Sequence, residues 1–201
     1  MQDFISQLKP ALLGKIVFTI VCGFAYPLIV YGVAQVAFHH QAEGSLIERG
    51  GQVVGSSLIG QSFTEPGYFW SRPSAITVAY DATNSSADNL GPTSPDLHKA
   101  VADRVTALRD ANRAASVPDD KTPVPIDLVT TSASGLDPDI SPAAAYYQVK
   151  RVAAVRNVPE SEVRALVDQH VEGRTLGILG DPHVNVLELN LDLDELAAAH
   201  H

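Results

Sequence analysis

The sequence predicts a single N-terminal transmembrane helix followed by one compact α+β (mixed α/β) extracytoplasmic domain. Two observations lead to this fold class. Residues Ile16–Phe38 contain no charged side chain, and about 20 apolar residues in a helix cross the hydrocarbon core of a bilayer. The remainder alternates helix-start signals with short strand-like stretches. We therefore expect a tail over residues 1–15, a transmembrane helix over 16–38 and a folded domain over 39–201.

Basic residues near the apolar run predict its orientation. Lys9 and Lys15 precede the run, and the next Lys or Arg is Arg49. The positive-inside bias therefore puts the N-terminal tail in the cytoplasm and the folded domain outside it. A cleaved secretory signal is disfavoured because its apolar region would span only about 7–15 residues. Pro27 would remove one hydrogen bond within the helix, which transmembrane helices tolerate.

The domain is expected to begin with a β-hairpin and to contain three helices. Gly50 and Gly51 separate two short apolar stretches within Ser45–Gly60, and paired glycines suit a tight hairpin turn. Capping residues and prolines predict helix starts; these helices begin at Ser94-Pro95, run from Ser141-Pro142 to about Asn157, and run from Pro159 to Gly173. Apolar patterning predicts strands over Ile76–Tyr80, Ile126–Thr131 and Val186–Leu196.

Composition narrows the classes of function. The chain has 14 Lys and Arg against 23 Asp and Glu, a net charge of −9. A nucleic-acid partner is not expected, because such binding depends on Lys and Arg that neutralise phosphates. Cys22 is the only cysteine, which excludes an intramolecular disulfide and a Cys-based zinc site.

Motifs that carry catalysis are absent from the sequence. It contains no G-x-S-x-G, H-E-x-x-H or G-x-x-x-x-G-K-[ST] pattern. Asp120-Lys121-Thr122-Pro123 resembles the phosphorylation motif of P-type ATPases, but Pro replaces its Gly, and we interpret the match as coincidence. Asp137 and Asp139 fall short of the six or more oxygen ligands that a hard cation takes, so a structural turn is favoured. No catalytic, cofactor-binding or metal-binding residue is expected.

The irregular stretch 60–75, GQSFTEPGYFWSRPSA, contains a cluster of aromatic residues. Phe63 and Phe69 are expected to pack on the domain core. Other aromatic and Arg side chains are expected at a protein interface, where these residue types are enriched; core packing of the same side chains is the open alternative. The candidate partner contacts are Gln61, Tyr68, Trp70, Arg72 and Asn89.

Several long motifs, taken in chain order, carry a resemblance to a known family. They are GSSLIGQSF, YFWSRPSA, SADNLGPTSP, VPIDLVTTSASGLDPDISPAAAYYQVKRVA and LGDPHVNVLELNLDLDE. With the N-terminal apolar run, the chain resembles the C subunit (KdpC type) of the bacterial Kdp potassium-transporting P-type ATPase over nearly its whole length. Asp139 departs from the pattern, where His is often expected, so the resemblance supports no special role for that position.

The resemblance implies a place in a four-part complex in the cell inner membrane. A channel-like subunit would bind potassium, a P-type ATPase subunit would hydrolyse ATP, and a small helical subunit would accompany them in the lipid bilayer. The C subunit would be non-catalytic, would assemble and stabilise the other subunits, and would raise the apparent ATP affinity as a catalytic chaperone. ATP and potassium would then be handled by the complex, with no cofactor bound directly by this chain.

A function of another class stays open beside this one. The chain is alternatively a membrane-anchored extracytoplasmic enzyme or solute-binding domain, in which Arg72, Asp81, Asn89 and Asp137 converge in a pocket. The expected topology and the lack of a phosphate-binding loop argue against direct ATP contact, so any effect on ATP affinity is expected to be conformational.

Overall fold

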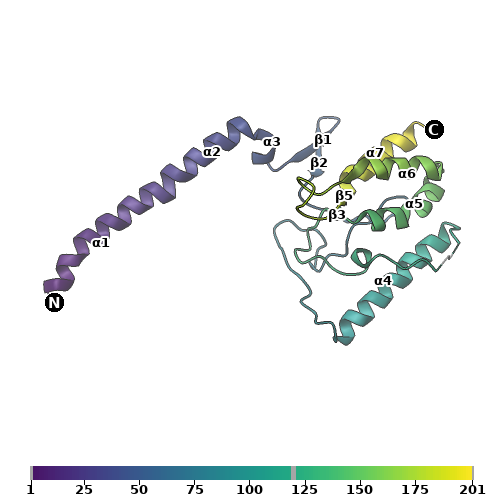
Figure 1. Cartoon of the computed structure of the whole chain (residues 1–201), viewed down its shortest axis with the longest axis horizontal. Helices are drawn as coiled ribbons and strands as arrows, with labels where there is room; N and C mark the ends of the chain where they lie inside the picture. The colour runs from purple at the N-terminus through teal and green to yellow at the C-terminus, as the bar shows by residue number, and fades with distance from the viewer. Residues whose placement is uncertain (1, 119–120, 201) are drawn as a thin grey trace. The chain divides into compact units, whose positions relative to one another are not determined.

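The chain forms two compact units, residues 1–46 and 47–201. The computed structural model describes residues 2–118 and 121–200 (Figure 1). The first unit is helical. Its elements are α1 (Gln2–Ile20), a π-helical turn (Val21–Ala25), α2 (Tyr26–Ala37) and the short α3 (His39–Ala42).

Pro27, at the start of α2, explains the π-helical turn. Proline has no backbone N–H, and in an α-helix its ring collides with a carbonyl of the preceding turn. Widening that turn by one residue relieves the collision, and the N–H of Tyr26 donates to the carbonyl of Val21, five residues earlier. The helix therefore continues through the proline, as predicted.

The helix between Ser6 and Ala37 is long and apolar enough to cross a membrane, and none of it is buried within the chain. Large apolar side chains such as Phe24 and Ile29 lie exposed along it. A continuous apolar surface of this size is stable in lipid and not in water. This matches the transmembrane helix predicted from the uncharged run, although the helical conformation begins well before Ile16.

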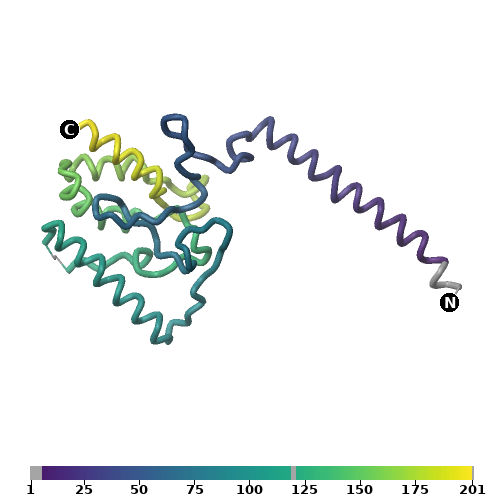
Figure 2. Tube along the Cα trace, turned by 180° about the vertical axis from the view of Figure 1, so that it is seen from behind, coloured from purple at the N-terminus to yellow at the C-terminus, as the bar shows by residue number. Residues whose placement is uncertain are grey.

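The second unit is an α+β domain with two small sheets. In chain order, the elements from Leu46 onward are β1 (Leu46–Arg49), β2 (Gln52–Ser56), α4 (Pro95–Ala114), a 3₁₀ turn (Ile126–Leu128), β3 (Asp139–Ile140), α5 (Pro142–Arg156), α6 (Glu160–His170), β4 (Val171–Glu172), β5 (His183–Asn185) and α7 (Val186–Ala198). One sheet is the β1–β2 hairpin, and the other is antiparallel with the order β3-β5-β4. Figures 1 and 2 show α4 and α7 at opposite edges of the domain, with α5 and α6 between them.

The predicted hairpin and helices are confirmed, with one altered end. Gly50 and Gly51 both have positive φ angles of 59° and 79°, as a tight hairpin turn requires. Ser141 caps α5 by accepting a hydrogen bond from the N–H of Ala144 at 3.1 Å. Helix α6 ends at His170 and not at Gly173, because the next two residues pair with β5 instead.

Two of the predicted strands, Ile76–Tyr80 and Ile126–Thr131, are wrong. Residues 76–80 form bends and turns, and only Ile76 of this stretch is buried while Val78 is exposed. In the second stretch, the adjacent residues Leu128 and Val129 are both buried, which the alternating faces of a strand do not allow beside a single core. Apolar composition alone misled both predictions.

The third predicted strand, Val186–Leu196, is also wrong and forms α7. Its buried residues recur at intervals of three and four residues, which is the period of a helix. Asn185 begins the helix, since its side chain accepts a hydrogen bond from the N–H of Glu188 at 3.2 Å. Leu187, Leu189 and Leu193 belong both to the alternating pattern and to this buried helical face. The sequence therefore resembles a strand although it forms a helix. The buried residues of α7 are Val186, Leu187, Leu189, Asn190, Leu193 and Ala197.

Substitution of Leu193 and Leu191 distinguishes the helix from a strand. Leu193 is fully buried, whereas Leu191 is partly exposed. Leu193→Ala should lower the free energy of unfolding by about 2–5 kcal/mol, and Leu191→Ala by about 1 kcal/mol. Chemical unfolding of the full chain in detergent measures both. Equal losses would contradict the helix, because a strand places both residues on one face.

Candidate functional site

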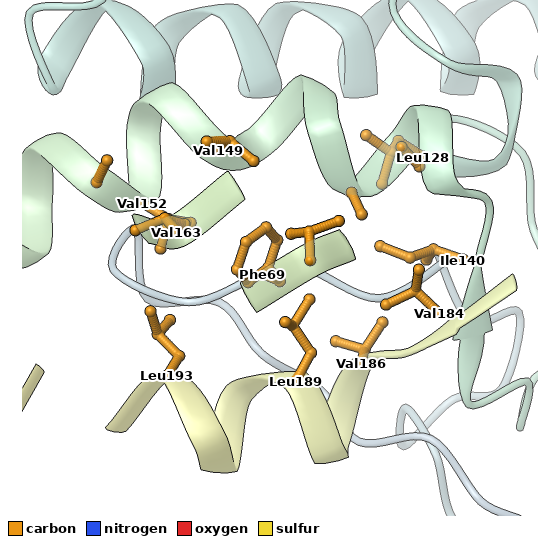
Figure 3. Packing of buried hydrophobic residues seen from close by; sticks show 14 of the residues in the cluster. Phe69, Leu128, Ile140, Val149, Val152, Val163, Val184, Val186, Leu189 and Leu193 are labelled. Carbon is orange, nitrogen blue, oxygen red and sulfur yellow. The ribbon is translucent and has the colours of Figure 1, made fainter. Parts of the chain in front are cut away.

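The centre of the aromatic stretch, at Phe69, packs into the domain core between α5 and α7. Phe69 is fully buried, and Figure 3 shows it between Val149 and Val152 on one side and Leu189 and Leu193 on the other. Phe63 is partly buried and packs against the same cluster. The prediction that Phe63 and Phe69 pack on the core is therefore confirmed.

Two buried amide side chains hold the backbone at the centre of this stretch. The side-chain oxygen of Asn190 accepts from the N–H of Phe69 at 2.8 Å, and its amide donates to the carbonyl of Phe69 at 2.9 Å. Gln148 does the same for Trp70, accepting from its N–H at 2.8 Å and donating to its carbonyl at 3.2 Å. Each amide replaces the backbone groups that a neighbouring strand would provide. The segment thereby packs on the core with its polar groups paired.

Arg151 adds a buried positive charge to the same contact. It is fully buried on α5 and donates to the carbonyls of Pro66 and Tyr68 and to the side-chain oxygen of Gln148. Its guanidinium lies 4.4 Å from the centre of the Trp70 ring, a favourable cation–π distance. Burial lowers the pKa of Arg151 to about 10, so the group remains charged at neutral pH. Carbonyl oxygens and an aromatic face thus replace the hydration of this cation.

Arg156, five residues further along α5, fixes Tyr68. Its Nε donates to the carbonyl of Gly67 at 2.7 Å, and its guanidinium lies 4.2 Å from the centre of the Tyr68 ring. Asp194 of α7 accepts from the Tyr68 hydroxyl at 3.1 Å and pairs with Arg156 at 2.7 Å. Tyr68 is therefore held between two helices, with part of its surface accessible.

The remaining candidate contacts differ in how they are held. Gln61 is half-buried and donates to the carbonyl of Val54 at 2.8 Å. Trp70 is half-buried, and its indole N–H donates to the carbonyl of Glu65 at 3.0 Å. Asn89 is exposed, and its side chain donates to the nearby carbonyl of Ala87. Their contact with a partner stays a prediction.

Two of the four residues predicted for the pocket of the alternative function, Arg72 and Asp137, are paired with each other. The two side chains form an ion pair at 2.8 Å, and Arg72 also donates to the carbonyl of Thr131 at 3.3 Å. The other two residues make local contacts instead: Asp81 accepts from Thr83, and Asn89 bonds within its own loop. The structure therefore brings together one pair and not the predicted set of four.

A cavity of about 270 Å³ lies beside the aromatic stretch. Its lining includes Phe63, Trp70, Arg72, Tyr80 and Arg104. Burial raises the pKa of Tyr80 to about 12, so its hydroxyl stays protonated and donates to the carbonyl of Arg72 at 2.5 Å. The cavity is lined by aromatic residues and two arginines, residue types that are enriched at protein interfaces.

Sequence reasoning missed Tyr80 and Arg104 as lining residues of this cavity. The apolar pattern places Tyr80 in a strand, and no residue in the sequence indicates its positive φ of 63°. Arg104 lies on α4, distant in sequence, and donates to the carbonyl of Val129 at 3.0 Å. No local pattern connects either residue with the aromatic stretch.

A larger cavity, of about 610 Å³, is lined by residues of α4, α5 and α6 and of the connection after α4. Its charged lining residues are Arg109, Arg113, Lys150 and Arg164. Pro118 and Thr122 also line it, on either side of residues 119 and 120. Asp120, the acidic residue of the Asp-Lys-Thr-Pro stretch, lies outside the described residues.

The second acidic residue of the predicted turn, Asp139, lies in β3 near His183 and Glu172. Its N–H donates to the side chain of Asp137 at 3.1 Å, which agrees with the expected structural turn. Burial raises the pKa of Asp139, His183 at 3.9 Å opposes that effect, and the negative charges of Asp137, Glu172 and Glu188 add to it. The ionised carboxylate of Asp139 is therefore less stable in the folded chain than in water.

An apolar helix able to cross a bilayer, joined to an α+β domain, defines a single-pass membrane protein. The family model described as KdpC, K+-transporting ATPase, c chain, matches residues 8–195. The chain is 56% identical over 191 residues to a potassium-transporting ATPase KdpC subunit of Sorangium cellulosum, covering 94% of this chain and 98% of the relative. The KdpC subunit of Herpetosiphon aurantiacus is 53% identical over 189 residues, covering 94% and 95%.

A third relative, the KdpC subunit of Dechloromonas aromatica, is 52% identical over 193 residues, covering 96% of this chain and 98% of the relative. The chain belongs to the KdpC family, as its motifs indicated. It is therefore a subunit of a potassium-transporting ATPase.

The buried amide of Asn190 offers a direct test of the core arrangement. Asn190→Leu keeps a similar volume but leaves the N–H and carbonyl of Phe69 unpaired. Each unpaired buried group costs about 1–3 kcal/mol, so the loss of both pairings should lower the free energy of unfolding of the full chain by about 2–6 kcal/mol. Asn84→Ala, at an exposed loop position, serves as the control and should change stability little. An unchanged midpoint for Asn190→Leu would refute the pairing.

Asp139 should make stability depend on pH in a predictable direction. Its folded-state pKa is raised, so its unfavourable ionisation is present at pH 7 and is relieved as pH falls through that pKa. Asp139→Asn should therefore raise the melting temperature at pH 7, and the gain should shrink as the pH approaches 4.

Asp81→Asn provides a control of opposite sign. Hydrogen bonds from Thr83 lower the pKa of Asp81, so this substitution should lower the melting temperature at pH 7. Melting curves of both variants between pH 7 and about pH 4 measure the sign of each effect. A loss of stability with Asp139→Asn at pH 7 would contradict the assigned effect of burial.

Proposed function

We propose that this chain is a non-catalytic subunit of an ATP-driven potassium uptake pump, which assembles and stabilises the channel-like and ATPase subunits. The observation that supports this proposal most directly is the family match over residues 8–195, which includes both the apolar helix and the domain. The names of the relatives also describe a subunit of a larger ATPase. The small helical subunit completes the proposed set of partners.

The proposed topology places the domain away from the cytoplasm. Lys9 and Lys15 precede the apolar helix, and the positive-inside bias assigns that end to the cytoplasmic side of the inner membrane. The tail over 1–15 is then cytoplasmic, residues 16–38 span the bilayer and 39–201 form the periplasmic domain. Cytoplasmic ATP does not reach a domain placed there.

An effect of this subunit on ATP affinity is therefore conformational in our proposal. A subunit that binds one state of the ATPase more tightly than another shifts the population toward that state. By linkage, ATP affinity changes only as far as the two states differ in their binding of the subunit. The domain and its apolar helix would both contribute to that difference.

The cavity beside the aromatic stretch is the proposed contact with a partner subunit. Trp70 and Arg72 line it, and their backbones are held by the buried contacts with α5 and by the hydroxyl of Tyr80. A rigid aromatic wall loses little conformational entropy on binding. Tyr68, Gln61 and Asn89 remain candidate contacts outside this cavity's lining.

Removal of the subunit tests the proposed function. Membranes that contain the other subunits but lack this chain should lose potassium-stimulated ATPase activity. If partial activity remains, the ATP concentration for half-maximal rate should rise about 5–150-fold, the usual range of allosteric coupling. Normal activity at unchanged ATP dependence, together with purification of this chain without other subunits, would refute the proposal.

Two controls belong with this experiment. Ser161→Cys, at an exposed position of α6, in a Cys22→Ala background should react with a membrane-impermeant maleimide in cells whose outer membrane has been made permeable. Labelling only after the inner membrane is broken would overturn the proposed orientation. A complex restored with the unchanged chain should recover the activity that deletion removes.

A further inference from the structure

The connection between β4 and β5 presents apolar side chains to the outside of the domain. We call residues Arg174–Asp181 the apolar loop. Leu176 is 86% exposed, Ile178 74% and Leu179 58%, and residues 175–180 carry no charged side chain. Scattered exposed apolar residues are common on protein surfaces, but three within four positions form a patch.

The apolar loop has a defined conformation. Thr175 and Leu179 exchange backbone hydrogen bonds, at 2.9 Å from the N–H of Thr175 and 3.0 Å from the N–H of Leu179. Arg174 and Asp181 pair at 2.6 Å across its ends. The turn therefore closes on itself and directs its side chains outward.

Leu176 occupies an unfavourable backbone conformation at the tip of the loop. Its φ is +54°, and a left-handed conformation costs a residue with a side chain roughly 1–2 kcal/mol. The neighbouring Gly177 and Gly180, with φ of 76° and 77°, adopt such angles without that cost. Leu176 is nevertheless almost fully exposed, so it gains little from burial within this chain. Strain of this kind is found at functional sites.

Charges near the loop distinguish a protein partner from a lipid surface. At the base of the loop Asp181 is paired with Arg174, and Glu172 and Asp139 add two further carboxylates, each within 3.9 Å of His183. Without Asp3, Lys9 and Lys15, the 23 acidic and 14 basic residues of the chain become 22 and 12. An anionic bilayer surface repels such a domain, whereas a groove with basic side chains at its border attracts it.

We propose that the apolar loop inserts Leu176 and Ile178 into an apolar groove, bordered by basic side chains, on another subunit of the potassium-transporting ATPase. This inference rests on the proposed function, because the partner it requires is another subunit of the same complex. Insertion buries the two side chains that this chain leaves exposed, and it offsets the strain at Leu176. The interface is separate from the cavity lined by Trp70 and Arg72.

Photo-crosslinking in the whole complex tests the loop. A benzophenone amino acid is placed at position 176 or 178 of the full chain, with position 126 as control, where Ile126 is 74% exposed outside the loop. Irradiation of membranes should give a covalent adduct with another protein subunit from positions 176 and 178. Adducts with lipid only, no adduct, or equal adducts from position 126 would each overturn the proposal.

A double substitution measures the strength of the contact. Leu176→Ser with Ile178→Ser should reduce retention of the other subunits during purification at least about tenfold, since each 1.4 kcal/mol changes affinity tenfold. The melting temperature of the chain alone should not change, because neither side chain is buried in it. Leu176→Met with Ile178→Met should retain the complex. Full retention with the Ser variant would overturn the loop as a contact.

The results also separate this inference from the proposed function. If deletion of the whole chain abolishes activity while the Ser variant keeps the complex intact, the loop proposal fails and the proposed function stands. If deletion leaves activity intact, the proposed function fails irrespective of the loop.

Discussion

The domain depends on an irregular piece of backbone, residues 66–72, that packs on its core without a neighbouring strand. A buried N–H or carbonyl must find a partner, and here side chains supply most of the partners. Gln148 and Arg151 lie three residues apart on α5, and Asn190 and Asp194 lie four apart on α7. Such spacings place both members of each pair on one helical face. The two helices must therefore present these faces to the same segment.

The packing of apolar residues follows from that arrangement. Phe69 enters the core between α5 and α7 (Figure 3). Asn190 of α7 holds the backbone of Phe69, and Gln148 of α5 holds the backbone of Trp70, the next residue. The aromatic rings of Tyr68 and Trp70 then lie against the guanidinium groups of α5. Burial of polar side chains specifies the position of the segment, and burial of apolar ones stabilises it.

Local signals in the sequence were sufficient for the apolar helix, the glycine turn and the helix starts. Each of these depends on neighbouring residues, such as Ser141 and the N–H of Ala144. The hydrogen bonds between Asn190 and Phe69 join residues that are 121 positions apart in the sequence, and no local sequence pattern predicts them. The alternation of Leu with polar residues predicts a strand at the C-terminal end, because it places Asn190 on the solvent-facing side. The candidate stretch could be found by composition, but Tyr80 and Arg104 join it only through the fold.

The π-helical turn at Val21–Ala25 has a consequence for the surface of the apolar helix. An α-helix turns by about 100° per residue, so one additional residue rotates everything after it by about that angle relative to an uninterrupted helix. A stripe of side chains followed along α1 does not continue into the same stripe on α2. The two halves of the helix therefore offer differently oriented faces, and a neighbour that packs on one half does not meet the matching face of the other.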